Sequence, residues 1–471
     1  MKRFTTYLLV GGWALLSASC SAVRECKAPE LNLPEQLVAG VTDSTTIADI
    51  GWWKFYGDAA LCELIQRTLD NNKDMLAAAA RVEQMRQLYR IDKANRLPDF
   101  SARVYGDRET NDYYQKSFSN DPELGAKVGV SWELDLWGNL RWAKRKGGAE
   151  YWAKRKGGAE YLASVEEWRA MRMTLVAEVA TAYFQLMALD NELSIVKQTL
   201  ETRRQDVRLA KLRFEGGLTA ETVYQQAKVE YASTAALIPE LERKIKVMEN
   251  SISLLVSGYP GERIRRSGLS LNITMPEKLP VGIPSVLLQR RPDVRASEQA
   301  LQAALAGVGV AYADRFPRLN FTLTGGVENG VLSHIFESPF SYVLGSVTAP
   351  VFGFGRKQAK YRAALAAYDQ ARLKYEKKVL EVFKETDDAV VTYRNVRRSA
   401  ERKESLRDAA IKYVELATIQ YRGGNINYID VLDAQRRYFD AQIGLNNAVR
   451  DEHLALVQLY KALGGGWTVE E

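Results

Sequence analysis

The two halves of the sequence carry the same motifs in the same order, and this internal repeat constrains the fold more than any other feature. Residues 96–100 (RLPDF) match residues 315–319 (RFPRL), and residues 207–217 (VRLAKLRFEGG) match residues 414–424 (VELATIQYRGG). Each half predicts a helix, two short strands, a very long helix, a Gly-Gly break and another long helix. A chain of 471 residues is long for one hydrophobic core, so at least two structural units are expected.

A ten-residue segment, WAKRKGGAEY, occurs twice in tandem at positions 142–151 and 152–161, in the first half only. Ten extra residues turn a helix roughly 80° out of phase, at about 100° per residue. The segment therefore either loops out, helped by its glycines, or rotates the helix face. We interpret it as a tolerated duplication; an extension that presents basic residues is the alternative.

The N-terminus is typical of a secretory signal. A short basic segment precedes an apolar stretch at residues 7–16, and small residues lead to Cys20. This layout predicts a signal peptide over residues 1–19. Cys20 is then expected to carry a covalent lipid, although Ser17 stands where lipoprotein signals usually have a large aliphatic residue. Plain secretion, with Cys20 in the discarded peptide, is the alternative. No other cofactor and no metal are expected.

Apolar residues in the long helical segments recur at alternating steps of three and four. Residues from Trp168 to Leu200 follow this spacing, as do residues from Tyr375 to Val396. Such a repeat, sustained over several turns, predicts helix-on-helix packing of the coiled-coil type. The pairs Gly216-Gly217 and Gly423-Gly424 interrupt it, and each is expected to be the turn at which a long helix folds back.

Four segments alternate between polar and apolar residues. The clearest is 127–136 (KVGVSWELDL); residues 318–325 (RLNFTLTG), 100–107 and 341–351 repeat the pattern. Alternation over about ten residues is typical of membrane β-barrel strands, although half-buried sheets of soluble proteins show it too. Four strands cannot close a barrel, and open sheet edges do not occur in lipid. The strand count therefore predicts an oligomeric barrel, and three copies would supply twelve strands.

Composition and motifs argue against several other classes. The 65 Lys and Arg exceed the 58 Asp and Glu, but the excess is spread along the chain, so no nucleic-acid groove is expected. The two histidines, His334 and His453, lie far apart, and no HExxH, P-loop or GxSxG motif occurs. After the first 20 residues no apolar run is long enough for a membrane helix, which excludes a multi-span helical transporter. The chain is not expected to be an enzyme.

Several motifs together resemble the outer membrane factor family, the TolC-like channels of tripartite efflux pumps, and within it the lipoproteins similar to OprM and NodT. The motifs are Trp52-Trp53 with Phe55 and Asp58, RVEQ at 81–84, RLP at 96–98, WELDLWG at 132–138, RRPDVR at 290–295, YIDVLDAQR at 428–436 and LYKALGGGW at 459–467. They extend from about residue 50 to the C-terminus, so the resemblance covers nearly all of the mature chain.

The resemblance implies a mainly α fold with membrane β-structure. A homotrimer would form a twelve-stranded outer-membrane β-barrel, with four strands per chain, in contact with outer-membrane lipid. The barrel would continue into a large periplasmic barrel of coiled-coil hairpins. The implied function is passive efflux of small toxic compounds, with a periplasmic adaptor and an inner-membrane RND-type pump as partners. The expected organisation is a lipid-anchored tether (20–50), a first repeat (51–262), a linker (263–285), a second repeat (286–467) and a tail (468–471).

One pair of acidic residues suggests a gate. Asp430 and Asp433 lie three residues apart on a predicted helix, hence on one face, shortly after the Gly-Gly break. Threefold symmetry would bring six carboxylates around one axis, and such rings favour cations and bind divalent ions. The matching residues of the first half, Val223 and Gln226, are neutral. A solvated helix face near an N-terminus is the alternative.

The resemblance assigns further roles near the same end. It implies that the hydroxyl of Tyr421 helps to hold the closed state, but the basic partner usual five residues later is replaced by Ile426. It also implies that the hairpin ends contact the adaptor. These tip residues are Gly216, Gly217, Leu218, Thr219, Gly423 and Gly424.

Two other functions stay open at this point. A TolC-like conduit for an ABC-type protein or peptide exporter would have the same barrel and tunnel, and it would differ in partners and in the effect of its deletion. A lipid-anchored periplasmic scaffold without a pore would leave the alternating strands without a means of closure.

Overall fold

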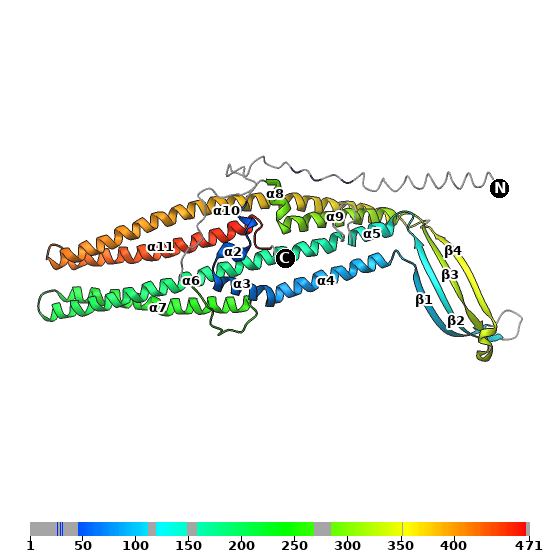
Figure 1. Ribbon diagram of the computed structural model, residues 1–471, viewed down its shortest axis with the longest axis horizontal. Coiled ribbons are helices and arrows are strands. Elements are labelled where there is room, and N and C mark those ends of the chain that lie inside the picture. Colours follow the sequence, from blue (N-terminus) through cyan, green and yellow to red (C-terminus); the bar gives the residue numbers. More distant parts are fainter. Residues whose placement is uncertain are drawn as a thin grey trace. The chain divides into compact units, whose positions relative to one another are not determined.

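The computed structural model describes residues 46–111, 119–147, 158–267, 284–350 and 352–467, together with Cys26, Pro29 and Leu31 (Figure 1). The signal peptide, Cys20 and the C-terminal tail lie outside these residues. The fold is mainly helical with one four-stranded sheet, as predicted. It divides into two compact units: residues 1–31, 80–166 and 295–378 form unit 1, and residues 32–79, 167–294 and 379–471 form unit 2.

The elements follow the predicted order in both halves. The first half contains η2 (Ile47–Asp49), α2 (Trp52–Tyr56), α3 (Ala59–Asn71), α4 (Lys73–Ala94), β1 (Asp99–Asn111), β2 (Ser119–Leu134), α5 (Asn139–Gly147), α6 (Ala159–Glu215) and α7 (Glu221–Leu255). The second contains α8 (Pro284–Arg290), α9 (Pro292–Ala313), β3 (Arg318–Asn329), η3 (Leu332–Glu337), β4 (Pro339–Thr348), α10 (Arg356–Arg422) and α11 (Tyr428–Ala462). Helix α8 begins within the predicted linker.

The boundaries of corresponding helices match between the two halves to the exact residue. Helices α4 and α9 begin and end at positions that differ by 219 (73 and 292, 94 and 313), and α7 and α11 at positions that differ by 207 (221 and 428, 255 and 462). Hydrogen bonds repeat as well. Asn72 Nδ2 donates to Leu255 O over 2.9 Å, and Arg291 Nη1 donates to Ala462 O over 3.2 Å, at residues related by the same two offsets. The halves therefore share packing as well as sequence.

The long helix of the first half differs from that of the second at the duplicated segment. Helix α10 is uninterrupted, whereas its counterpart is divided into α5 and α6. The starts of α5 and α10 differ by 217 (139 and 356), and the ends of α6 and α10 by 207 (215 and 422), so the ten extra residues fall between Gly147 and Ala159. Glycine is a poor helix former, and the WAKRKGGAEY repeats place Gly-Gly pairs at this point. Residues 148–157 lie outside the described part of the chain.

The sheet is antiparallel, with the strand order β1-β2-β3-β4 (Figure 1). All four predicted strands are present. Strand β2 ends at Leu134, two residues earlier than predicted, because the carboxylate of Asp135 already caps α5 by accepting from Leu140 N over 3.0 Å. Strand β4 ends at Thr348, before the predicted limit of 351.

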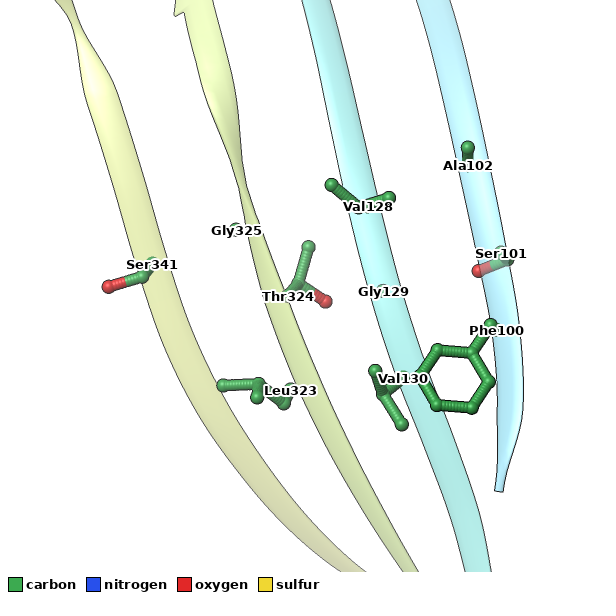
Figure 2. Close-up of a pocket in the computed structure, with 10 residues that line it drawn as sticks. All are labelled: Phe100, Ser101, Ala102, Val128, Gly129, Val130, Leu323, Thr324, Gly325 and Ser341. Atoms are coloured by element: carbon green, nitrogen blue, oxygen red, sulfur yellow. The ribbon is translucent and has the colours of Figure 1, made fainter. Parts of the chain in front are cut away.

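One face of the sheet is apolar and exposed. Figure 2 shows the four strands side by side, with the ring of Phe100 next to Val130, its partner in the β1–β2 register. Val104 and Val347, on the same face, are 84% and 66% exposed. A sheet in a soluble protein buries its apolar face against a second layer. The exposed face here is typical of a sheet that meets lipid.

The helices differ from the sheet in their hydropathy. None of those in the described ranges combines the length and the hydropathy needed to cross a bilayer.

In unit 2 the N-terminal motif packs against the end of α11. The Phe55 ring stacks on Tyr460 with 4.1 Å between centroids. Asp58 begins α3 by accepting from the backbone N–H groups of Ala60 and Leu61, at 2.8 and 3.0 Å. The other oxygen of Asp58 accepts from the Tyr183 hydroxyl of α6 over 3.1 Å. These contacts explain why aromatic and acidic residues occur together in this motif.

Candidate functional site

The predicted turns at the hairpin ends have the same geometry in both halves. After α6, Gly217 has a φ of 70° and Leu218 N donates to Arg213 O over 2.8 Å. After α10, Gly424 has a φ of 77° and Asn425 N donates to Gln420 O over 2.9 Å. A left-handed residue followed by this hydrogen bond ends many helices and favours glycine. The structure thus accounts for the glycines as turn residues.

The ends of the two hairpins share one apolar core in unit 2. All four helices contribute to it, largely through alanines, which let helices approach closely. The buried members are Ala210, Ala227, Ala417, Tyr428, Val431, Leu432 and Ala434. Ile426, which replaces the expected basic residue, packs against this core. The two hairpins are therefore held together by packing at the end where the gate is predicted.

Tyr421 has a basic partner, but from the other hairpin. Arg213 Nη1 of α6 donates to the Tyr421 hydroxyl of α10, and the guanidinium carbon lies 4.9 Å from the centre of the ring. The resemblance implies a basic partner five residues after Tyr421, whereas the observed partner lies 208 positions before it. Spacing along the chain carries no signal for such a contact.

Asp430 and Asp433 lie one turn apart near the start of α11, as their spacing predicted; Asp430 is exposed and Asp433 is half-buried, whereas the neighbouring Val431 and Ala434 are buried. Each has a partner in its own segment. Asp430 Oδ2 accepts from Asn427 N over 3.0 Å and completes a capping box at the start of α11. Asp433 Oδ2 accepts from Arg437 Nε over 2.8 Å, one helical turn later. The sequence analysis did not name Arg437 as a partner of Asp433, although oppositely charged residues four positions apart on a helix can pair.

A charge cluster with a buried ion pair joins three helices farther from the turns. Arg203 Nη1 of α6 lies 2.9 Å from Glu230 Oε2 of α7, and the two side chains are only 8% and 10% exposed. Arg436 Nε of α11 donates to the other oxygen of Glu230 over 2.9 Å. Removing one member of such a buried pair leaves an uncompensated charge. We call Arg203, Glu230 and Arg436 the inter-hairpin charge cluster.

Polar residues beside this cluster have shifted pKa values. Burial raises the pKa of Asp206, while the hydrogen bond from Gln435 Nε2 (2.9 Å) and the charge of Arg203 oppose the shift. Burial lowers the pKa of Arg203, although Glu230 opposes it. The hydroxyl of Tyr428 is buried without a hydrogen-bond partner among the described residues, and burial raises its pKa. The sequence analysis includes Tyr428 and Gln435 in a family motif, but it does not predict that they meet Arg203 and Asp206, because these residues come from separate helices.

The described ranges contain no group of three or more His, Cys, Asp or Glu side chains placed to hold a metal ion. Cys62 is a free thiol.

Comparison with protein families matches both halves. The family described as outer membrane efflux protein matches residues 64–258 and 283–465. The starts of these ranges differ by 219 and their ends by 207, which are the offsets that relate the helices. The match is to a transport family, as expected for a chain without a catalytic motif.

Individual relatives agree with the family. The antibiotic efflux pump outer membrane protein ArpC of Pseudomonas putida is 30% identical over 96% of this chain and 94% of its own length. The toluene efflux pump outer membrane protein TtgC of the same species shows the same identity and coverage. A solved structure of the outer-membrane channel OprN has a TM-score of 0.84 at 28% identity, over 94% of this chain and 99% of that one. The chain therefore belongs to the outer membrane efflux protein family and is an outer-membrane channel component of an efflux pump.

Proposed function

We propose that the protein is the passive channel of a tripartite RND-type efflux pump, conducting small toxic compounds to the exterior. The observation that carries this proposal is the four-stranded sheet, which exposes an apolar face and leaves β1 and β4 without a strand partner in the described chain. Three copies would give twelve strands and satisfy the backbone groups that lipid cannot. Relatives named for antibiotic and toluene efflux support small compounds as cargo.

The gate of this channel is assigned to the ends of the second hairpin. In a trimer, Asp430 and Asp433 would supply six carboxylates around the axis, and Arg437 would supply three guanidinium groups beside them. Acidic side chains thus remain in excess, which favours cations in a narrow pore. Passage of a larger compound requires this constriction to widen. The Arg213–Tyr421 contact, the Arg436–Glu230 pair and the Gln435–Asp206 hydrogen bond are polar links that would hold the hairpins together in the closed state.

The remaining assignments follow from the same arrangement. The hairpin ends, including the exposed Leu218, would meet a periplasmic adaptor, which in turn joins an inner-membrane pump. A lipid on Cys20 would tether the N-terminal segment to the outer membrane.

Single-channel conductance in planar bilayers tests the gate. Wild-type protein is compared with Asp430→Ala/Asp433→Ala. The matched control is Glu404→Ala/Asp408→Ala, which also removes two exposed carboxylates of one helix face, both paired with Arg407. We expect a small cation-selective conductance in wild type and in the control. The gate variant should conduct more, or lose selectivity, because the carboxylates that attract cations are gone.

The other outcomes separate the parts of the proposal. A conductance unchanged by Asp430→Ala/Asp433→Ala would keep the channel and exclude these two residues as its gate. No conductance from a membrane-inserted trimer would contradict the channel and favour the scaffold. Deletion of the gene distinguishes the pump from a secretion conduit. Loss of a pump channel makes cells sensitive to small toxicants, whereas loss of a secretion conduit abolishes export of a protein.

A further inference from the structure

The second face of the sheet is polar and carries charged side chains that the proposed gate does not use. Because side chains alternate along a strand, the neighbours of Val104 and Val128 point away from the apolar face. Tyr105 of β1 and Glu328 of β3 both pair with Gly125 of β2, so the three strands share this polar face. In the proposed trimer, on which this inference rests, the apolar face meets lipid and the polar face lines the pore. Charged residues on the polar face include Arg103, Asp107, Glu123, Lys127 and Glu328.

These charges are grouped by sign. Arg103 lies directly opposite Lys127 in the β1–β2 register, and Asp107 lies directly opposite Glu123. Like charges directly opposite each other destabilise a sheet, whereas opposite charges would attract. We call Arg103 and Lys127 the basic pair, and Asp107, Glu123 and Glu328 the acidic group. Along β1 the two lie four residues apart, about 13 Å. A grouping that weakens the sheet indicates a role in the pore rather than in folding.

Tyr105 lies between the basic pair and the acidic group and contacts both. Its hydroxyl donates to Glu328 Oε2, and the Lys127 ammonium lies 4.7 Å from the centre of its ring. The ring lies across Gly125, where a Cβ would come within 2.6 Å of it. Glycine at this position leaves room for the ring between β1 and β3. Tyr105 thus holds Glu328 and Lys127 in place on the polar face.

The acidic group lies farther from the helices than the basic pair. Strand β2 ends at Leu134, five residues before α5, and β3 begins at Arg318, five residues after α9. The helices therefore attach at this end of the sheet (Figure 1). Lys127 is 7 positions from Leu134, whereas Glu123 is 11 positions from it. Since the helices are periplasmic, the acidic group lies nearer the outer opening of the barrel.

We propose that the acidic group selects ions in the outer part of the pore, where it favours cations and repels anions independently of Asp430 and Asp433. In a trimer, three carboxylates from each chain give nine, against six side chains from the basic pairs. Rings of charged side chains determine the ion selectivity of many channels. The acidic group belongs to unit 1 and the gate residues belong to unit 2. Each set can therefore be changed without touching the other.

The order of the charges along the pore has a consequence for transport. A compound that leaves the pore passes the basic pair first and the acidic group last. At 0.1 M salt the acidic group acts over about 10 Å. Within that distance a departing cation is attracted, and an anion that approaches from outside is repelled. The acidic group would thus keep external anions out while the periplasmic gate is open.

Reversal potentials in planar bilayers test the acidic group. They are measured under a KCl gradient in the Asp430→Ala/Asp433→Ala background, so that the gate carboxylates do not contribute. Glu123→Gln/Glu328→Gln should lower the ratio of K⁺ to Cl⁻ permeability. We expect a fall of roughly twofold or more, the effect of a unit charge about 8 Å away in water.

Two further variants serve as controls. Arg103→Gln/Lys127→Gln removes the opposite charge from the same face and should raise the permeability ratio. Glu337→Gln removes an exposed carboxylate of η3, in the connection between β3 and β4, and should leave the ratio unchanged. All differences should fade at 1 M salt, where the screening length is about 3 Å.

The outcomes separate the acidic group from the channel. A permeability ratio that Glu123→Gln/Glu328→Gln leaves unchanged, in a conducting pore, would overturn the inference and keep the channel. An equal fall in Glu337→Gln would overturn it too, since any charge near the outer opening would then act alike. No conductance from a membrane-inserted trimer would contradict the proposed function itself, and the selective role of the acidic group with it.

Thiol labelling of intact cells tests where these side chains point. Glu123→Cys is treated from outside with two reagents of similar size, one bearing a trimethylammonium group and the other a sulfonate. We expect both to react, the cationic one faster, because Asp107 and Glu328 remain and attract it. Adding Glu328→Gln should reduce this preference. Val104→Cys, on the apolar face, should react with neither reagent, and the unaltered chain gives the background from the native cysteines.

The labelling has its own contradicting results. Reaction of Val104→Cys in place of Glu123→Cys would reverse the two faces and overturn the inference. Equal rates of the two reagents at Glu123→Cys, or a preference that Glu328→Gln does not change, would show that the acidic group does not select by charge.

Discussion

At the scale of single residues, Glu230 links the two helices of its own hairpin and joins them to the other hairpin, because its buried carboxylate meets Arg203 of α6 and Arg436 of α11. Glu230→Gln would leave Arg203 buried without its counter-charge, at a cost of about 3–5 kcal/mol in the free energy of unfolding. Thermal unfolding in detergent, followed by the helical signal, measures the loss. Glu240→Gln, on the same helix and paired with the half-exposed Lys244, should change little. Similar losses in both variants would refute a special role for Glu230.

Substitution of Tyr421 tests its contact with Arg213, which replaces the expected salt bridge. Tyr421→Phe removes the oxygen that accepts from Arg213, so the closed state should loosen and single-channel conductance should rise. Arg213→Ala should act in the same direction, and the double variant should add little to either, because both remove one interaction. Tyr224→Phe, at the end of the other hairpin, is the control. Fully additive effects would show that the two residues act separately.

Asp314 makes a pH-dependent contribution to the stability of unit 1. Burial alone would raise its pKa, but hydrogen bonds from Lys357 (2.6 Å), Lys360 (3.2 Å) and Arg318 (3.0 Å) lower that pKa to about 2. The folded state thus prefers the ionised form, so this stabilisation is complete above the ordinary pKa of Asp. It is lost as the pH falls from about 4 to about 2.

Unfolding measured between pH 2 and pH 5 checks this effect of Asp314. Asp314→Asn should be less stable at pH 5 and should lose less stability on acidification than the wild-type protein. A wild-type curve and an Asp314→Asn curve that stay parallel across this range would contradict the prediction.

At the scale of elements, local periodicity was enough to predict the strands, the hairpins and their turns, because each depends on residues close together in sequence. Alternation at residues 127–136 predicted β2, and Gly216-Gly217 predicted the turn before α7. The contacts among Arg203, Glu230, Arg436, Arg213 and Tyr421 were not predictable in this way. They join positions that become neighbours only after the helices pack, and a salt bridge has no spacing rule between separate helices.

The division between α5 and α6 yields an element-scale prediction. Deleting residues 148–157 joins residues 142–147 to residues 158–161 as one copy of WAKRKGGAEY, and both the starts and the ends of the long helices then differ between the halves by 207. The first half should form one long helix like α10, and the deletion should restore toxicant resistance to a knockout strain as well as the full chain does. Loss of resistance with normal assembly would show that the second copy has a role of its own.

At the scale of the whole molecule, the repeat makes each chain two similar segments of a larger ring. Strand pairings within a chain and between chains then alternate around it. The hairpins alternate too, with Asp430 and Asp433 on one kind and the neutral Val223 and Gln226 on the other. In such a ring the packing of the hairpins repeats nearly six times, whereas the acidic side chains repeat only three times. The residues that shape the wall and those that select ions can therefore vary independently.

The two unpaired sheet edges also bear on how the protein is made. A lone chain in the bilayer would expose the backbone groups of both edges to hydrocarbon, and each such group costs several kcal/mol. A single chain is therefore unstable in the membrane, and membrane insertion and association of the chains become one step. The rate at which the protein appears in the membrane should rise more steeply than in proportion to the supply of chains, so that halving synthesis cuts the yield of finished channels by more than half.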